Sequence, residues 1–135
     1  MFDTVLIAGL GLMGGSMAKA IKARTLSRVL GWNRTRATAE QALSDGAIDA
    51  IATEALYKEA DLVIIGLYPQ ATVDWLLENM PKMKKGCVVV DMVGVKQFMV
   101  DRLEQAALDA GVHFVGGHPM AGREFSGLDF SLPTL

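Results

Sequence analysis

Short apolar runs alternate along the chain with stretches in which apolar residues recur at helical spacing. The runs are rich in β-branched residues and predict strands over 4–8, 28–32, 48–52, 62–67, 87–91 and 112–115. Between them, apolar positions three and four residues apart predict helices around 13–21, over 35–43, around 55–59, over 72–79 and around 99–110. Strands and helices therefore alternate up to residue 115.

Most of these strands are apolar on both faces. Strands of this kind occur in parallel sheets that helices cover on both sides. The pattern thus predicts an α/β, doubly wound fold with one parallel sheet and helices on both faces. We expect one domain over 1–130, followed at 131–135 by the start of a connection to a further segment.

Composition narrows the class of protein. A chain of 135 residues with 51% hydrophobic and 21% charged residues is typical of one globular domain. The longest apolar stretch, 5–13, contains two glycines and is shorter than the roughly 18 residues that cross a bilayer. No basic segment precedes it, and the lone Cys87 lies in an apolar run, as a core residue would. We expect a cytoplasmic protein that has no membrane partner and no metal site.

A glycine-rich turn follows the first predicted strand and opens a helix. It has the G-x-G-x-x-G spacing, with Gly9, Gly11 and Gly14 as its glycines and with Leu12 and Met13 between the last two. Gly9 permits a tight turn, Gly11 lets the backbone approach a pyrophosphate, and Gly14 allows close packing of helix on strand. A second strand ends about twenty residues later, as in Rossmann-type dinucleotide-binding domains. The alternative is a purely structural turn.

The charges are unevenly distributed. Between Thr4 and Ala39 there is no acidic residue, but there are six basic ones: Lys19, Lys22, Arg24, Arg28, Arg34 and Arg36. The net charge of −2 argues against a nucleic-acid partner. A solvated helix face would explain the basic segment, but the same segment holds the glycine-rich turn. We therefore favour an anionic ligand there.

The end of the second strand indicates which dinucleotide binds. An acid there would bind the adenosine ribose and repel a 2′-phosphate, but this chain has Asn33, Arg34, Thr35 and Arg36 instead. These residues favour NADP, with NAD as the alternative, because arginine pairs with a phosphate dianion. On another interpretation, Asn33 or Thr35 only caps the next helix and the arginines are solvated. Leu67, Tyr68 and Pro69 follow the fourth strand and are expected to contact the cofactor from the same edge.

A histidine follows the last predicted strand. His118 lies between Gly117 and Pro119, and it is expected at the edge of the sheet where the glycine-rich turn lies. A neutral imidazole there accepts a hydroxyl proton. The alternative is a loop histidine that a backbone carbonyl satisfies. His113, near the start of its strand, is expected to be structural.

Three segments together resemble the prephenate/arogenate dehydrogenase family. They are G-L-G-L-M-G-G-S at 9–16, D-x-x-G-V-K at 91–96 and G-G-H-P-M-A-G-x-x-x-x-G at 116–127. The resemblance implies the N-terminal nucleotide-binding domain of a two-domain enzyme. The helical C-terminal domain of that enzyme, which forms a homodimer, is expected to be missing from this chain.

The resemblance also implies a reaction, the oxidative decarboxylation of prephenate or arogenate in tyrosine biosynthesis. His118 would accept the proton of the ring hydroxyl while hydride passes to the nicotinamide. Gly94, Lys96, Arg123 and Ser126 would lie near the substrate, although many members carry serine at the position of Gly94. Without the helical domain, we expect cofactor binding and little turnover.

Other interpretations remain open. The G-L-G-x-M-G and N-R-T segments also resemble β-hydroxyacid and 6-phosphogluconate-type dehydrogenases, but Val93, Gly94 and Val95 stand where those enzymes have serine or threonine. A non-catalytic NADP-binding module and a Rossmann-like domain that binds nothing are the remaining alternatives.

Overall fold

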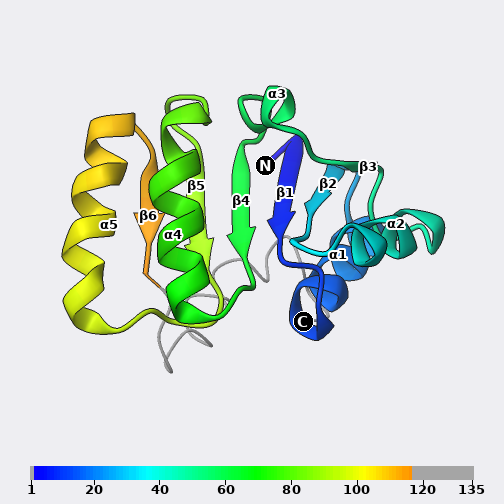
Figure 1. Ribbon diagram of the computed structural model, residues 1–135. Helices are drawn as coiled ribbons and strands as arrows, with labels where there is room; N and C mark the ends of the chain where they lie inside the picture. The colour runs from blue at the N-terminus through cyan, green and yellow to red at the C-terminus, as the bar shows by residue number, and fades with distance from the viewer. Residues whose placement is uncertain (1, 117–135) are drawn as a thin grey trace.

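Within residues 2–116, six parallel strands form the centre of the structure (Figure 1). The computed structural model describes residues 2–116. The strands lie in the order β3-β2-β1-β4-β5-β6. Their bounds are β1 Thr4–Ala8, β2 Arg28–Trp32, β3 Ala50–Ile51, β4 Leu62–Ile65, β5 Val88–Asp91 and β6 His113–Val115. This arrangement confirms the doubly wound, Rossmann-type α/β fold.

Five α-helices connect the strands, and their bounds differ from the sequence prediction at a few ends. They are α1 Leu12–Arg24, α2 Arg36–Ser44, α3 Glu54–Tyr57, α4 Pro69–Asn79 and α5 Gln97–Ala110, and a 3₁₀ turn, η1 Met80–Lys82, follows α4. Helix α4 begins three residues earlier than expected, because Pro69 occupies a first-turn position that needs no N–H partner. Strand β4 ends at Ile65, before the predicted residue 67, and β3 is only two residues long.

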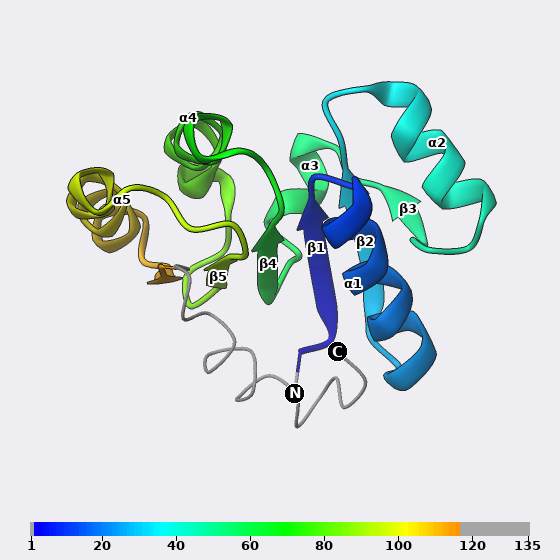
Figure 2. The same ribbon diagram turned by 90° about the horizontal axis from the view of Figure 1, so that it is seen from below.

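Helices cover the two faces of the sheet. Val5 and Ile7 of β1 pack with α1 and α2, whereas Leu6 and Ala8 pack in a second cluster with α3, α4 and α5. Figure 2 shows α4 and α5 on one side of the strands and α1 on the other. Because both faces of β1 and β4 are buried, these strands carry apolar side chains at every position after the first residue of β1. None of the helices within residues 2–116 is long and apolar enough to cross a membrane.

The candidate site lies at β1, where the order of the strands in the sheet reverses. Strand β1 pairs with β2 on one side and with β4 on the other, and Ala8 lies beside both Trp32 and Ile65. The three strands therefore end at the same edge of the sheet. After β1 the chain enters α1 on one face of the sheet, and after β4 it enters α4 on the other face. In open α/β sheets, ligands bind in the crevice at such a carboxyl edge.

The opposite, amino edge of the sheet is closed by carboxylates. One Asp61 oxygen accepts the N–H groups of Asp3 (3.0 Å) and Thr4 (2.9 Å), and the other pairs with Lys84. Asp49 likewise accepts the N–H of Val29 (2.7 Å). The Lys84 ammonium and the Thr4 N–H hold the pKa of Asp61 below its usual value, against the opposing effect of burial.

The two residues that the sequence predicts to be structural, Cys87 and His113, lie away from the crevice edge. Cys87 is fully buried in the core, and burial raises the pKa of its thiol to about 12, so the thiol stays protonated. His113 is the first residue of β6 and therefore lies at the amino edge. Cys87 is thus confirmed as a core residue.

We predict that Asp61→Asn lowers the free energy of unfolding at pH 7 by roughly 1–3 kcal/mol, because the strand-start N–H groups lose a charged acceptor. A carboxyl whose pKa is lowered by folding stabilises the fold above the pKa of the unfolded chain. That contribution is lost as the pH falls through the folded pKa. The free energies of unfolding of the parent and the variant should therefore converge as the pH falls from about 4 downward.

Urea unfolding at pH 7 and pH 3 measures both effects. Asp101→Asn, at an exposed position of α5, is the control, and an equal loss in both variants would contradict the prediction.

Candidate nucleotide site

The turn between β1 and α1 is built on a close approach of backbone to backbone. Gly9 has φ +97°, a left-handed conformation that side chains disfavour. A Cβ atom at this position would lie 2.6 Å from the Gly66 carbonyl oxygen. The Gly9 N–H also donates to the Trp32 carbonyl oxygen (2.7 Å). The turn is therefore held between the ends of β2 and β4.

The other two glycines of the motif have different surroundings. At Gly14 a Cβ would lie 1.7 Å from the Gly9 carbonyl oxygen and 3.4 Å from the Ile7 side chain. Gly14 therefore packs most tightly against the glycine-rich turn itself. Its contact with β1, which the sequence predicts, is looser. At Gly11, the N-cap of α1, no atom of residues 2–116 lies within 4 Å of the point that a Cβ would occupy, apart from Gly11 itself and its chain neighbours.

The start of α1 beside Gly11 is a candidate site for a phosphate group. No side chain within residues 2–116 caps α1, and the first turn of this helix carries no acid. The first N–H groups of an uncapped helix attract a phosphate, and the absence of a side chain at Gly11 leaves them accessible.

Asn33 ties the glycine-rich turn to the end of β2. Its Oδ1 accepts the N–H of Leu10 (2.8 Å), and its amide donates to the carbonyl oxygen of Thr35 (3.1 Å). Thr35 is the N-cap of α2, but its side chain makes no capping hydrogen bond. The capping alternative is thus not what the structure shows. Contact between Asn33 and a cofactor stays a prediction.

The two arginines after β2 are both exposed at this edge. Arg36 pairs with Glu40 through a 3.5 Å contact of its Nε atom, and both side chains are largely in solvent. Arg34 instead lines a cleft. Of the two, Arg34 is therefore the one that faces a candidate ligand.

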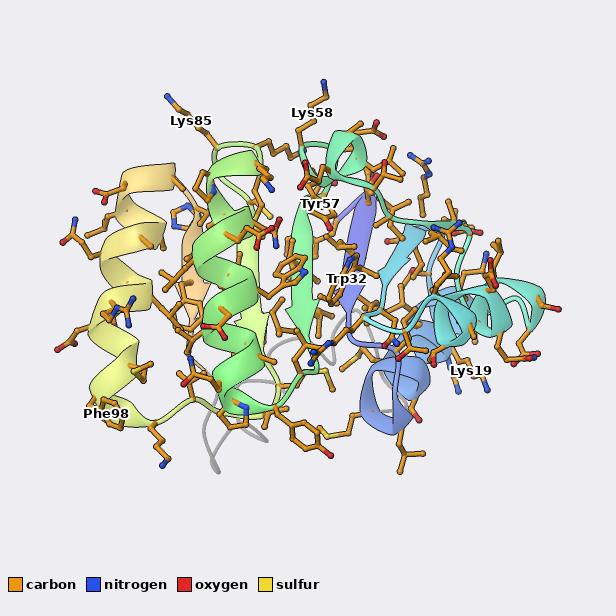
Figure 3. All side chains as sticks on the ribbon, viewed as in Figure 1. Lys19, Trp32, Tyr57, Lys58, Lys85 and Phe98 are labelled. Atoms are coloured by element: carbon orange, nitrogen blue, oxygen red, sulfur yellow. The ribbon has the colours of Figure 1, made fainter. Side chains whose placement is uncertain are left out.

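This cleft, which we call the adenosine cleft, has a volume of about 620 Å³. It opens near the carboxyl edge, where Trp32, Arg34, Leu67 and Ala71 line it, and it continues past Asp74 between α3 and α4. Figure 3 shows Trp32 and Tyr57 on the same face of the sheet, one toward each end of the strands. Leu67 lines the cleft, and its contact with a cofactor stays a prediction.

Three aromatic residues form one wall of the adenosine cleft, and sequence reasoning missed them. The ring centroids of Trp32 and Trp75 are 5.7 Å apart, and those of Tyr57 and Trp75 are 5.5 Å apart. Tyr57 and Trp75 are also core residues, and nothing in their local sequence indicates that they border a cleft. The available signal was the position of Trp32, directly before the candidate cofactor residues at the end of β2.

The inner end of the adenosine cleft is acidic. Glu54 accepts a hydrogen bond from Lys82 (2.6 Å), and Glu78 lies 3.8 Å from the same ammonium group. Burial, followed by the charges of Glu54 and Glu78, raises the pKa of Tyr57 to about 12. This end of the cleft therefore disfavours an added negative charge, and a phosphate fits better near Arg34.

Tyr68 and Pro69 begin α4 at the same edge. Tyr68 is the N-cap and is 86% exposed, and Pro69 is the next residue. Leu12 (89%) and Met13 (50%), at the start of α1, are also exposed. The structure therefore brings Leu12, Met13 and Tyr68 to one edge with their side chains accessible.

The segment between β5 and α5 is shaped by a buried acid. Asp91 is fully buried, and its Oδ1 accepts the N–H groups of Val93 (3.0 Å) and Gly94 (3.1 Å). Burial raises the pKa of Asp91, and its Oδ2 has no partner within residues 2–116. Gly94 has φ +88°, so a serine side chain here would be strained. This chain thus forms a glycine turn at the position where many members of the family that it resembles carry serine.

Lys96 lies near this turn, whereas three further candidates lie outside the described part. Lys96 is the exposed N-cap of α5 and lines a small pocket of about 160 Å³ between α4 and α5. Phe98 lines the same pocket and lies at the carboxyl edge in Figure 3. His118, Arg123 and Ser126 fall beyond residue 116, so their predicted roles stay predictions.

Comparison with known proteins identifies the family. A family described as "Prephenate dehydrogenase, nucleotide-binding domain" matches residues 17–135. The chain belongs to this family. It is 39% identical over 132 residues to a prephenate dehydrogenase of Bacillus subtilis and 30% identical over 129 residues to that of Lactococcus lactis. These matches cover 95% and 92% of the chain, but only 35% and 36% of the relatives.

A solved structure agrees with this assignment. The prephenate dehydrogenase of A. aeolicus, in complex with hydroxyphenyl propionate and NAD+, matches with a TM-score of 0.76 and 28% identity. The match covers 90% of this chain and 43% of that one. The chain therefore corresponds to the nucleotide-binding part of prephenate dehydrogenases and spans about a third of the length of its curated relatives.

Substitutions at two glycines of the turn should show which glycine the packing of the turn requires and which one only leaves space for a ligand. Gly14→Ala places a Cβ against the Gly9 carbonyl, and we predict a loss of roughly 1–3 kcal/mol of folding stability or more. Gly11→Ala places a Cβ in open space, so its loss should stay within about 1 kcal/mol, the scale of an N-cap change. Thermal and urea unfolding of both variants measure the difference. Equal losses would contradict the geometry of the turn described above.

Proposed function

We propose that this chain binds NADP at its carboxyl edge and forms the cofactor-binding part of a prephenate or arogenate dehydrogenase. The observation that carries the proposal is the open space beside Gly11 at the uncapped start of α1. Family membership supports it. When bound, the cofactor supplies a nicotinamide that accepts hydride. The chain itself would hold the pyrophosphate with backbone N–H groups and the adenosine in the adenosine cleft.

Two features favour NADP over NAD. Residues 33–36 contain no acid that would accept hydrogen bonds from the ribose and repel a 2′-phosphate. Arg34 lines the adenosine cleft at its carboxyl-edge end, and none of the ion pairs formed within residues 2–116 involves it. Its guanidinium group is therefore available to a phosphate.

For the substrate side, we propose His118 as the acceptor of the ring-hydroxyl proton. A neutral imidazole near pH 7 suits that task. Lys96, at the start of α5, supplies a positive charge for a substrate carboxylate, and Arg123 and Ser126 are further candidates from the same motif. The overall reaction would be an oxidative decarboxylation that yields an aromatic ring.

The first prediction from this proposal concerns cofactor preference. NADP(H) should bind roughly tenfold or more tightly than NAD(H), because a charge-assisted pair contributes about 1.5–3 kcal/mol. Arg34→Asp should narrow or reverse that ratio. Both tryptophans of the chain line the adenosine cleft, so quenching of their fluorescence measures binding directly. Lys58→Asp makes the same charge change at the amino edge, as Figure 3 shows, and should leave the ratio unchanged. Equal affinities of the parent for the two cofactors would refute the NADP preference.

The second prediction concerns His118. In the full protein, His118→Asn should leave NADP(H) affinity within about twofold and lower kcat roughly 10²–10⁴-fold, the usual contribution of a general base. Formation of reduced cofactor with prephenate and with arogenate measures kcat. If the variant keeps its kcat with both substrates, His118 is not the proton acceptor. If neither nucleotide binds to the parent protein, the proposed cofactor site itself is wrong.

A further inference from the structure

One face of α4 sets the chemistry of the adenosine cleft. Ala71, Asp74 and Glu78 are spaced three and four residues apart and all line the cleft. Because Pro69 begins the helix at the carboxyl edge, Asp74 lies one turn further in than Ala71, and Glu78 one turn beyond that. A flat group that enters between Arg34 and Ala71 would therefore meet the Asp74 carboxylate first.

Asp74 differs from the other acids of the cleft in its partners. Glu54 and Glu78 both lie within 4 Å of the Lys82 ammonium group. None of the ion pairs within residues 2–116 involves Asp74. Its Oδ1 accepts a hydrogen bond from the Gln70 amide (3.0 Å), which orients the carboxylate on the helix. A charged carboxylate accepts more than one hydrogen bond, so acceptor capacity remains for a ligand.

The aromatic wall limits what such a ligand can be. Trp32, which is partly buried, and Trp75, which is 7% exposed, both line the cleft, and stacking on their accessible ring surface favours a planar heterocycle. A carboxylate at the edge of that heterocycle favours an N–H donor and repels a carbonyl oxygen. Adenine presents its exocyclic 6-amino group as such a donor, whereas guanine has a carbonyl oxygen at the same ring position.

We propose that Asp74 is a specificity-determining residue that accepts a hydrogen bond from the 6-amino group of the cofactor's adenine. This inference rests on the proposed function, because it assumes that the adenosine half of the dinucleotide occupies the cleft. Arg34 contacts the phosphate side of the adenosine, and Asp74 contacts the edge of the base. A cleft built in this way rejects a dinucleotide whose base has a carbonyl oxygen at position 6.

The test compares NADP with its analogue in which hypoxanthine replaces adenine, so that a carbonyl oxygen replaces the 6-amino group. Tryptophan quenching measures both dissociation constants without any turnover. The parent protein should bind NADP roughly tenfold more tightly than the analogue. In Asp74→Asn the side-chain amide both donates and accepts, so the ratio should fall to within about twofold of unity.

A matched control is available on another helix. Gln105 and Asp109 of α5 form the same hydrogen bond as Gln70 and Asp74, also 3.0 Å long and four residues apart. Asp109→Asn therefore removes an equivalent charge away from the cleft and should keep the parental ratio. Urea unfolding of both variants checks that each one is folded.

The outcomes separate this inference from the proposed function. If the parent binds NADP and the analogue equally well, or if Asp74→Asn keeps the parental ratio, Asp74 does not read the base, although the cofactor site stands. If neither dinucleotide quenches the tryptophans or binds by calorimetry, the proposed function fails and this inference fails with it.

Discussion

The close approach of three glycines is the constraint on which the candidate site depends. Gly9, Gly14 and Gly66 meet at the point where the chain leaves β1, and a side chain at Gly9 or Gly14 would overlap with backbone atoms. This contact brings the start of α1 against the ends of β1 and β4. The helix N-terminus can then face the crevice without a side chain in between, and the Asn33 bridge to Leu10 holds the second loop in register with it.

The two edges of the sheet use polar groups in opposite ways. At the amino edge, Asp49 and Asp61 accept strand-start N–H groups and pair with lysines, so these charges are neutralised within the fold. Within residues 2–116, α1 has no capping side chain and Arg34 has no ion pair at the carboxyl edge, and several apolar side chains are exposed there. Donors and apolar surface that the fold itself leaves unused are what a dinucleotide requires.

The sequence predicted the sheet well because local signals and tertiary packing agree there. The strands are apolar on both faces, and four of the five helices carry clear helical periodicity. The prediction was wrong at several ends of strands and helices, where single residues determine the boundary. Gly66 continues the apolar pattern of β4, but it belongs to the turn that packs on Gly9. Within the site, the glycine motif and Arg34 were visible as spacing and charge. The aromatic wall was not, because Trp32, Tyr57 and Trp75 come from three separate elements that only the fold brings together.

The adenosine cleft combines charges of opposite sign, and their order along it matters more than their sum. Arg34 lies at the carboxyl-edge end and Asp74 lies further in, whereas Glu54 and Glu78 lie at the inner end with Lys82 between them. A ligand with a phosphate at one end and an uncharged amine-bearing base at the other matches this order, because each part meets a group of complementary polarity. The reverse orientation would place a phosphate against carboxylates beside a low-dielectric aromatic wall, where like charges repel more strongly than in water. The cleft therefore favours one direction of binding, and that direction points the pyrophosphate toward the glycine-rich turn.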